Sequence, residues 1–271
     1  MLMNKRDILI IPFKIPTILA QCSQLATLRQ LQKVIHLIEI VFEHQDFVVI
    51  NKPPFIAVQN EREQPGILPQ VCAQLGIAKL WLVHRLDKVT SGLLILAKSE
   101  GAAAEFGVMF EAHAVQKFYL AISSKKPKKK QGTVSGGMKK VRDGLWILDS
   151  SQVQRATTQF FSFGISPGLR LFVLKPLTGK THQIRVMMKS LGSAILGDEL
   201  YKGDKAERTY LHAFALKFSY QHQNIELVCP PNIGTEFIAA TTQTEVAKLT
   251  TPWDLAWPNY KVPLNINDQQ K

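Results

Sequence analysis

The sequence predicts an α+β fold with a mixed, largely antiparallel sheet and flanking helices and loops. Two observations lead to this class: strand-like runs dominate the chain, and the few helical segments are not regularly interleaved with them. The chain has 271 residues, of which 46% are hydrophobic, and this is ample for a sizeable core. The sequence contains no internal repeat.

The first elements are expected after an unpatterned start. Residues 1–36 have no clear hydrophobic period, whereas the runs IEIVFEH (38–44) and DFVVINK (46–52) predict two short strands around a turn. The pair Pro53–Pro54 is a turn signal that ends the second strand. Apolar residues at helical spacing predict a helix over 67–77.

The next part of the chain alternates between apolar runs and one helix. The segment LWLVHRLD (80–87) is expected to be extended, and SGLLILAKS (91–99) is typical of a buried strand. Residues 100–112 carry alanine and glutamate and predict a helix. A strand over 116–124 would place its apolar residues on one face and Tyr119 on the other.

A lysine-rich loop separates this part from the next strands. Five lysines fall among the six residues 125–130, which indicates a solvated loop or one that contacts phosphates. Strands are predicted at 156–165 and 169–177, on either side of Ser-Pro-Gly. The run TGKTHQIRVMMKSLG (178–192) predicts a helix that ends at its glycine.

The chain is expected to contain one main domain between two terminal segments. Final strands at 210–220 and 224–231 complete a domain that we assign to 37–249. Residues 1–36 form an N-terminal extension of unclear role. Residues 250–271, with their prolines and polar end, are expected to be a loosely attached C-terminal tail.

The charge of the chain indicates a polyanionic partner. It has 33 lysines and arginines against 21 aspartates and glutamates, and its formal net charge is +12. A surplus of this size favours nucleic acid over a small uncharged substrate, although a merely basic protein would show it too.

The cysteines and the N-terminus bear on the compartment. Cys22, Cys72 and Cys229 are far apart and form no C-x-x-C, so the sequence indicates neither a metal site nor a disulfide framework. The N-terminal apolar run is interrupted by Lys14 and by prolines, and Gln21 stands where a signal peptidase needs a small residue. No run approaches the length of a membrane span. We therefore expect a cytoplasmic, soluble protein.

The stretch VHRLDKVTSGLLILAKS contains the first candidate site. Asp87 leads into an apolar strand, and burying an unpaired carboxylate is so costly that the group needs a partner or a chemical role. If the segment is extended, Arg85 and Asp87 project together while His84 and Leu86 face the other way. An Arg85–Asp87 ion pair that merely holds a turn explains the spacing equally well. His84 alone is more often a satisfied core histidine than a ligand.

Two further candidates are individually weak. On a helix, His182 and Arg185 would project from a similar face, but an amphipathic helix with a solvated basic side has the same pattern. Tyr119 lies opposite the apolar positions of its strand, where a tyrosine is more often a residue of the sheet surface than a catalytic one.

Taken together, these segments resemble a known family. HRLDKVTSGLLILAK is similar to the long and specific H-R-L-D-x-x-T-S-G-L signature of the RluA-type pseudouridine synthases. The resemblance covers residues 38–230, through the segments VVINKPPFIAV, KFYLA, PLTGKTHQIRV, ILGDELY and YLHAFALKF. It implies the pseudouridine synthase fold and an isomerase that modifies specific uridines in structured RNA, either rRNA or tRNA, as a monomer without a cofactor or metal.

The resemblance also implies roles for four residues. Asp87 matches the aspartate that acts as the nucleophile, and Tyr119 matches the tyrosine that packs on the target base. Arg185 matches the arginine that pairs with the catalytic carboxylate and would keep it charged. Arg85 matches the arginine involved in opening the RNA. The nucleophile attacks either C1′ of the sugar or C6 of the base, and the residues do not decide between them.

The chain departs from its apparent relatives in two places. It has Arg-Val-Met-Met-Lys where relatives often have Arg-Val-His, and residues 1–36 are too few and too unpatterned for the small S4-type RNA-binding domain that many relatives carry. Two other functions remain as alternatives. A non-catalytic RNA-binding or ribosome-assembly protein would use the same basic surface, and a nucleoside or glycoside hydrolase would need a second carboxylate.

Overall fold

The computed structural model describes residues 37–61, 64–149, 151–152 and 155–260. From Ile38 onwards these residues form one compact unit. The predicted N-terminal extension and the last eleven residues of the predicted tail lie outside the described residues.

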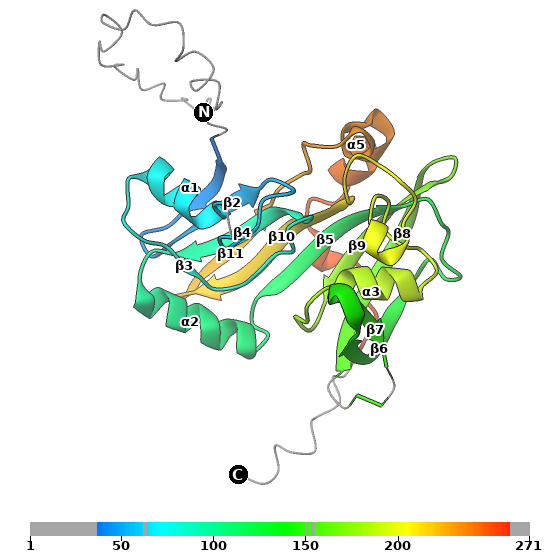
Figure 1. The fold of residues 1–271 in the computed structure, drawn as a ribbon, viewed down its shortest axis with the longest axis horizontal. Helices are drawn as coiled ribbons and strands as arrows, with labels where there is room; N and C mark the ends of the chain where they lie inside the picture. The colour runs from blue at the N-terminus through cyan, green and yellow to red at the C-terminus, as the bar shows by residue number, and fades with distance from the viewer. Residues whose placement is uncertain (1–36, 62–63, 150, 153–154, 261–271) are drawn as a thin grey trace, which may run out of the picture. The chain divides into compact units, whose positions relative to one another are not determined.

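A mixed, largely antiparallel sheet forms the centre of this unit, which confirms the predicted fold class (Figure 1). Within the described residues it has eleven strands, and nine of them follow one another across the sheet. In spatial order these are β1 (Glu39–Glu43), β2 (Phe47–Lys52), β4 (Ser91–Ala97), β10 (Leu211–Tyr220), β5 (Gln116–Ser123), β9 (Leu169–Pro176), β8 (Arg155–Ser166), β6 (Gln131–Lys140) and β7 (Trp146–Leu148). Two strands pair beside this path: β3 (Trp81–Leu82) with β4 and β11 (Gln223–Val228) with β10. The described pairs are antiparallel except for β4 with β10.

Helices cover the sheet and account for the burial of its strands. The described helices are α1 (Ile67–Leu75), α2 (Glu100–Glu111), α3 (Gln183–Ser190), α4 (Thr235–Ile238) and α5 (Ala240–Ala247), with short 3₁₀ turns at Arg142–Gly144, Glu199–Tyr201 and Pro252–Asp254. Figure 1 shows α1 and α2 beside the β1–β4 part of the sheet and α3 beside β8 and β9. Strand β2 is buried on both faces: Val48 and Ile50 pack with α1, and Phe47 and Val49 pack with α2. A strand covered on both sides has a continuous apolar run, as its sequence does.

The structure differs from the sequence prediction at both ends of the predicted 178–192 helix. Helix α3 begins at Gln183 and ends at Ser190, and residues 178–182 form a loop. The extended segment predicted at 80–87 is a strand only over β3, and the chain then forms the loop that carries Asp87.

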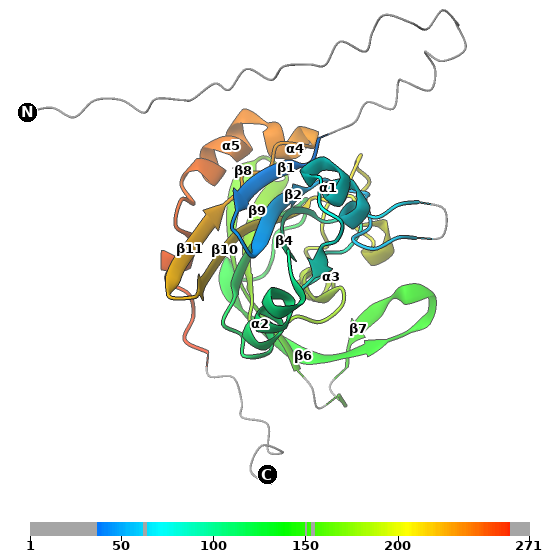
Figure 2. The same ribbon diagram turned by 90° about the vertical axis from the view of Figure 1, so that its left-hand side faces the viewer.

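Two further differences concern segments that the sequence pattern did not identify. No strand was predicted at β6, because it contains only two large apolar residues, Val134 and Met138, among glycines and polar residues. It forms because its backbone pairs with β8 over seven positions, and β7 then pairs with β6 (Figure 2). Helices α4 and α5 were not predicted either.

The described part of the predicted tail is packed onto the sheet and is not loosely attached. Trp253 and Trp257 lie against the core cluster of β5, β9 and β10, and both rings contact the ring of Phe118. Large aromatic rings supply enough buried apolar surface to hold a segment without regular structure.

The parallel pairing of β4 with β10 depends on a glycine. Gly92 has φ +105°, and a Cβ placed on it would lie 2.2 Å from the carbonyl oxygen of Ala213. The pair forms at Ser91–Gly92, directly after the loop of Asp87. The Thr-Ser-Gly of the sequence is therefore the point where two central strands meet behind that loop.

We predict that Gly92→Ala lowers the free energy of unfolding by about 2–5 kcal/mol, because it adds both a strained φ and a clash with backbone. Urea denaturation measures this. The matched control is Gly101→Ala in α2, where a Cβ meets nothing within 4 Å. That variant should be equal to wild-type or more stable by up to about 1 kcal/mol. Equal stability of the two variants would contradict the prediction.

Candidate active site

Asp87 lies on the loop between β3 and β4. The N–H of Thr90 donates to the carbonyl oxygen of Asp87 at 2.9 Å, which closes a tight turn just before β4 begins at Ser91. The side chain of Asp87 is 26% exposed, so the carboxylate can be reached by a ligand but is largely desolvated. It is placed at the edge of the core, where the sequence suggested that it needs a partner.

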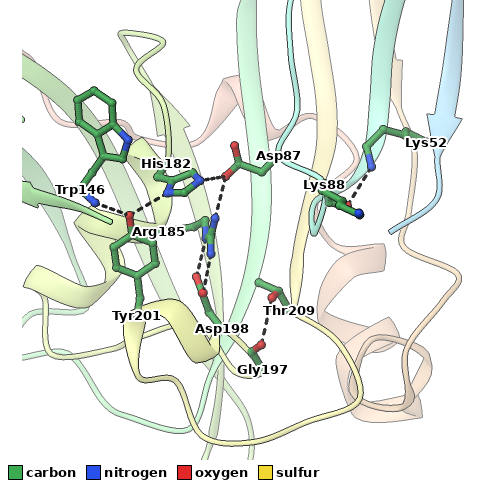
Figure 3. A network of polar contacts seen from close by, with 10 residues as sticks. All are labelled: Lys52, Asp87, Lys88, Trp146, His182, Arg185, Gly197, Asp198, Tyr201 and Thr209. Atoms are coloured by element: carbon green, nitrogen blue, oxygen red, sulfur yellow. Dashed lines mark hydrogen bonds and ion pairs between the residues drawn. The ribbon is translucent and has the colours of Figure 1, made fainter. Parts of the chain in front are cut away.

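The partner is Arg185, from α3. Its Nε and Nη2 donate to the two carboxylate oxygens of Asp198 at 2.7 and 2.8 Å, and its Nη1 lies 3.4 Å from Oδ2 of Asp87 (Figure 3). The side chain of Arg185 is 7% exposed and that of Asp198 only 1%. Two parallel hydrogen bonds of this kind fix the plane of a guanidinium, so Asp198 decides where Nη1 of Arg185 points.

The charges around Arg185 stabilise its positive form. Burial alone would lower the pKa of the guanidinium, but its hydrogen bonds to Asp198 and the negative charges of Asp198 and Asp87 raise that pKa above the usual value. The Tyr201 ring also lies under the guanidinium, 4.9 Å from ring centre to Cζ. Arg185 is therefore a permanent cation beside the Asp87 carboxylate.

Gln183 holds the loop that precedes α3. Its side-chain oxygen accepts hydrogen bonds from the Thr178 hydroxyl at 2.7 Å and from the Lys180 N–H at 3.0 Å. Its amide nitrogen donates to the carbonyl oxygen of Thr157 and to the hydroxyl of Thr158, both on β8. One buried amide thus fastens the loop 178–182 to the sheet and positions the first turn of the helix.

His182 completes the surroundings of Asp87 from that loop. Its backbone has φ +55°, and its Nε2 lies 3.9 Å from Oδ2 of Asp87. Its Nδ1 is 3.0 Å from the hydroxyl of Tyr201, which itself accepts the N–H of Trp146 at 3.2 Å (Figure 3). If the Tyr201 hydroxyl donates to Nδ1, a neutral imidazole carries its own proton on Nε2, facing Asp87.

The electrostatics favour that neutral imidazole. Burial lowers the pKa of His182, and the positive charge of Arg185 lowers it further, although the negative charges of Asp87 and Asp198 act in the opposite direction. The site therefore has one cation, Arg185, between two carboxylates, and an uncharged donor beside the exposed one.

Tyr119 and Asp87 come together although they lie on different elements. Tyr119 stands on β5 opposite Ala213 of β10, the residue that also faces Gly92, and its half-buried ring packs between two apolar clusters. Burial raises the pKa of its hydroxyl, and the negative charge of Asp87 raises it further. The phenol is neutral, and its pKa reports the proximity of the Asp87 carboxylate.

Arg85 does not pair with Asp87, so the alternative of an Arg85–Asp87 pair holding the turn is wrong. Arg85 is exposed, and among the described residues it has neither a hydrogen bond nor an ion pair. The predicted alternation also fails, because the strand ends at Leu82. Leu86 packs in the α1 cluster, whereas His84 lies against Phe110 of α2.

His84 is a satisfied core histidine. Its Nε2 accepts the N–H of Ile95 at 2.9 Å, which requires the nitrogen to be unprotonated. Burial, with a contribution from the nearby Lys117, lowers its pKa to about 3. In the described part of the chain, no group of three or more His, Cys, Asp or Glu side chains could hold a metal ion, and no helix is long and apolar enough to cross a membrane.

Two buried basic side chains lie behind the Asp87 loop. The Nζ of Lys52 donates to the carbonyl oxygens of Pro53, Ile56 and Lys88, and burial lowers its pKa to about 7. The guanidinium of Arg208 donates to the hydroxyl of Ser91 at 2.7 Å and to three backbone carbonyls. Through one partner each, Lys88 for Lys52 and Ser91 for Arg208, they bind the chain just after Asp87.

Sequence reasoning missed Asp198 and Tyr201. Both belong to ILGDELY, and the only signal was an aspartate next to a glycine at the end of an apolar run. The structure explains why this residue is a glycine. Gly197 has φ +75°, and a Cβ on it would lie 1.8 Å from the carbonyl oxygen of Arg208. The loop therefore approaches the segment before β10 closely and carries Asp198 inwards to Arg185.

Comparisons with known proteins agree on one family. The family model for RNA pseudouridylate synthase matches residues 46–190. A Haemophilus influenzae protein described as an uncharacterized RNA pseudouridine synthase is 51% identical over 219 residues, which are 80% of this chain and 98% of that protein. The ribosomal large subunit pseudouridine synthase D of Zymomonas mobilis is 31% identical over 69% of this chain and 62% of its own length.

Solved structures show the same fold. Human RNA Pseudouridylate Synthase Domain Containing 4 superimposes with a TM-score of 0.62 at 26% identity, covering 77% of this chain and 93% of that one. Human RNA Pseudouridylate Synthase Domain Containing 1 has a TM-score of 0.64 at 22% identity, covering 87% and 94%.

We predict that Asp198→Asn lowers the free energy of unfolding by about 3–5 kcal/mol, since it leaves the buried Arg185 without its main counter-charge. The measurement is denaturant unfolding at neutral pH. Asp204→Asn is the matched control from the same loop, where the carboxylate is 50% exposed and pairs with Lys125. Its effect should stay below about 1 kcal/mol. Similar destabilisation of both variants would show that Asp198 does not carry the buried charge pair.

Proposed function

Because this chain belongs to the RNA pseudouridylate synthase family, of the RluA type, we propose that Asp87 is the nucleophile that isomerises uridine to pseudouridine. The protein is an RNA pseudouridine synthase, an isomerase. The observation that supports the role of Asp87 is its carboxylate, which is accessible at the edge of the apolar core yet ion-paired with the buried Arg185.

The reaction explains why such a carboxylate is useful. Uridine loses its N1–C1′ bond, the base turns, and C5 takes the place of N1 on the sugar, so the proton of C5 must leave and N1 must gain one. An ionised aspartate can hold either fragment covalently, by attack at C1′ or at C6. Arg185 and His182 both lie near Oδ2 of Asp87, which leaves Oδ1 to face the substrate.

The proposal gives Tyr119 and Arg85 separate tasks. A uridine that reacts must leave its stack, and the half-buried, neutral ring of Tyr119 can receive the base beside Asp87. Arg85 is exposed on the loop of Asp87, where its guanidinium can take the place of the extruded base or bind a phosphate. Arg185 pairs with the carboxylate of Asp87 and aligns it.

The substrate RNA is proposed from the relatives. Proteins from Zymomonas mobilis and Rickettsia bellii that are 31% and 33% identical to this chain are named ribosomal large subunit pseudouridine synthases. We therefore propose ribosomal RNA, with transfer RNA as the alternative. Mapping pseudouridine in cellular RNA with and without this protein tests the choice. The cytoplasmic location and the monomeric state stay predictions.

The geometry argues against the hydrolase alternative. The structure does bring a second carboxylate, Asp198, near Asp87, as a hydrolase would require. However, both oxygens of Asp198 are engaged by Arg185 and the residue is 1% exposed, so it cannot reach a substrate. A non-catalytic RNA-binding protein, the other alternative, would not need the Arg185–Asp87 pair.

We predict that Asp87→Asn abolishes pseudouridine formation and leaves RNA affinity near the wild-type value. An amide cannot act as an anionic nucleophile, whereas affinity comes mainly from phosphate contacts. Single-turnover isomerisation and filter binding are measured on the same sample, together with the melting temperature. Asp46→Asn, at an acid on the β1–β2 turn, is the control and should keep wild-type activity. A folded Asp87→Asn protein that still makes pseudouridine would contradict the proposal that Asp87 is the nucleophile.

We predict that the lysine loop 125–130 contacts RNA phosphates. All five of its lysines are exposed, and the buried Pro127 anchors the loop between β5 and β6. Changing Lys126, Lys128 and Lys129 to Gln should flatten the plot of log affinity against log salt by roughly 0.7–0.9 for each phosphate that the loop no longer neutralises. Lys248→Gln, on the loop after α5, is the control. An unchanged slope in the triple variant would contradict the prediction and show that these lysines contact solvent and no phosphate.

A further inference from the structure

A strained turn follows β2, next to the Asp87 loop. The turn Pro53–Ile56 has a proline at its second position and a residue with positive φ at its third, the pattern of a type II turn. Glycine or asparagine normally takes that third position, but here it is Phe55, with φ +67°. A bulky residue in this conformation is a genuine outlier.

The strained position is held from two sides. The buried Nζ of Lys52 donates to the carbonyl oxygens of Pro53 at 2.8 Å and Ile56 at 2.9 Å, which are the first and last residues of the turn. The N–H of Phe55 donates to the carbonyl oxygen of Lys88 at 2.8 Å, and Lys52 reaches the same oxygen at 3.4 Å (Figure 3). The turn is therefore fastened to the residue that follows Asp87.

Packing does not explain why the side chain is a phenylalanine. Phe55 is 51% exposed and belongs to none of the apolar core clusters of the described residues. A glycine would adopt the same backbone without strain and would expose less apolar surface. Backbone strain that the fold tolerates without a gain in packing tends to occur at functional positions.

We propose that the ring of Phe55 is a stacking platform for an unpaired base of the RNA that neighbours the target uridine. The inference rests on the proposed function, in that the ligand of this face is RNA. The exposed Arg85 belongs to the same loop as Asp87 and supplies positive charge for the backbone of that strand. An aromatic ring accepts the face of any base, so the platform would hold the strand without reading its sequence.

Three variants separate stacking from strain and from general hydrophobicity. Phe55→Gly removes the ring and relieves the backbone, Phe55→Leu keeps apolar surface without an aromatic face, and Phe55→Trp keeps a ring. The probe is a short single-stranded oligouridylate, and its partner is the same oligomer with abasic residues. Val108→Ala, at an apolar residue of α2 that is 67% exposed, is the control for the removal of exposed apolar surface elsewhere.

The glycine variant should bind oligouridylate about 5- to 150-fold more weakly than wild-type, the range expected when one base stack is removed. Phe55→Leu should resemble it, while Phe55→Trp and Val108→Ala should stay within about twofold of wild-type. On the abasic oligomer the difference between wild-type and Phe55→Gly should vanish. The slope of log affinity against log salt should be unchanged, because the ring contacts no phosphate.

The melting temperature provides an independent test of the proposal. The melting temperature of Phe55→Gly should equal that of wild-type or exceed it by up to about 4 °C, since a left-handed backbone suits glycine. A lower melting temperature would mean that the ring serves the fold. Equal affinity of Phe55→Gly and wild-type for oligouridylate, or an equally large difference between them on the abasic oligomer, would also overturn the proposal. None of these readouts uses catalysis, so a wild-type protein that makes no pseudouridine would refute the proposed function alone.

Discussion

The site depends on one buried cation shared between two carboxylates. The side chain of Arg185 is 7% exposed, and a charge so buried is tolerated only with a matched anion, which Asp198 supplies through two hydrogen bonds. The orientation of Nη1 of Arg185 is then fixed, and Nη1 lies 3.4 Å from Oδ2 of Asp87. The longer, less buried contact is the one to Asp87, so this carboxylate pairs with Arg185 and is still accessible to a ligand.

The fold brings these groups together from segments that are distant in sequence. The Asp87 loop precedes β4, Tyr119 lies on β5, and both strands meet β10 at Ala213. Helix α3 approaches from the other half of the sheet, where the Gln183 amide ties its first turn to β8. The single parallel pairing among the described strands, β4 with β10, occurs where the glycine allows close approach. The one parallel pairing among the described strands therefore lies directly after the loop of Asp87.

Local patterns predicted the strands that are buried and the helices that are amphipathic, since burial on a sheet or helix face leaves a period in the sequence. They could not predict β6, whose stability comes from pairing with β8, nor the start of α3, where His182 adopts a left-handed backbone. Among the site residues, the motifs identified Asp87 and Arg185. The role of Asp198 was not predictable, because two adjacent carboxylates around one arginine are a property of tertiary contacts alone.

The turn after β2 and the Asp87 loop are held by the same buried lysine, Lys52. Lys52 is buried without a carboxylate within hydrogen-bonding distance among the described residues, and desolvation lowers its pKa to about 7. Two of its carbonyl partners belong to the strained turn and the third to the Asp87 loop. The buried ammonium group of Lys52 therefore holds both segments in place. Removing a proton from it would weaken those hydrogen bonds, because an uncharged amine is a poorer donor than an ammonium. The Asp87 loop and the strained backbone at Phe55 thus share one support, the ammonium group of Lys52.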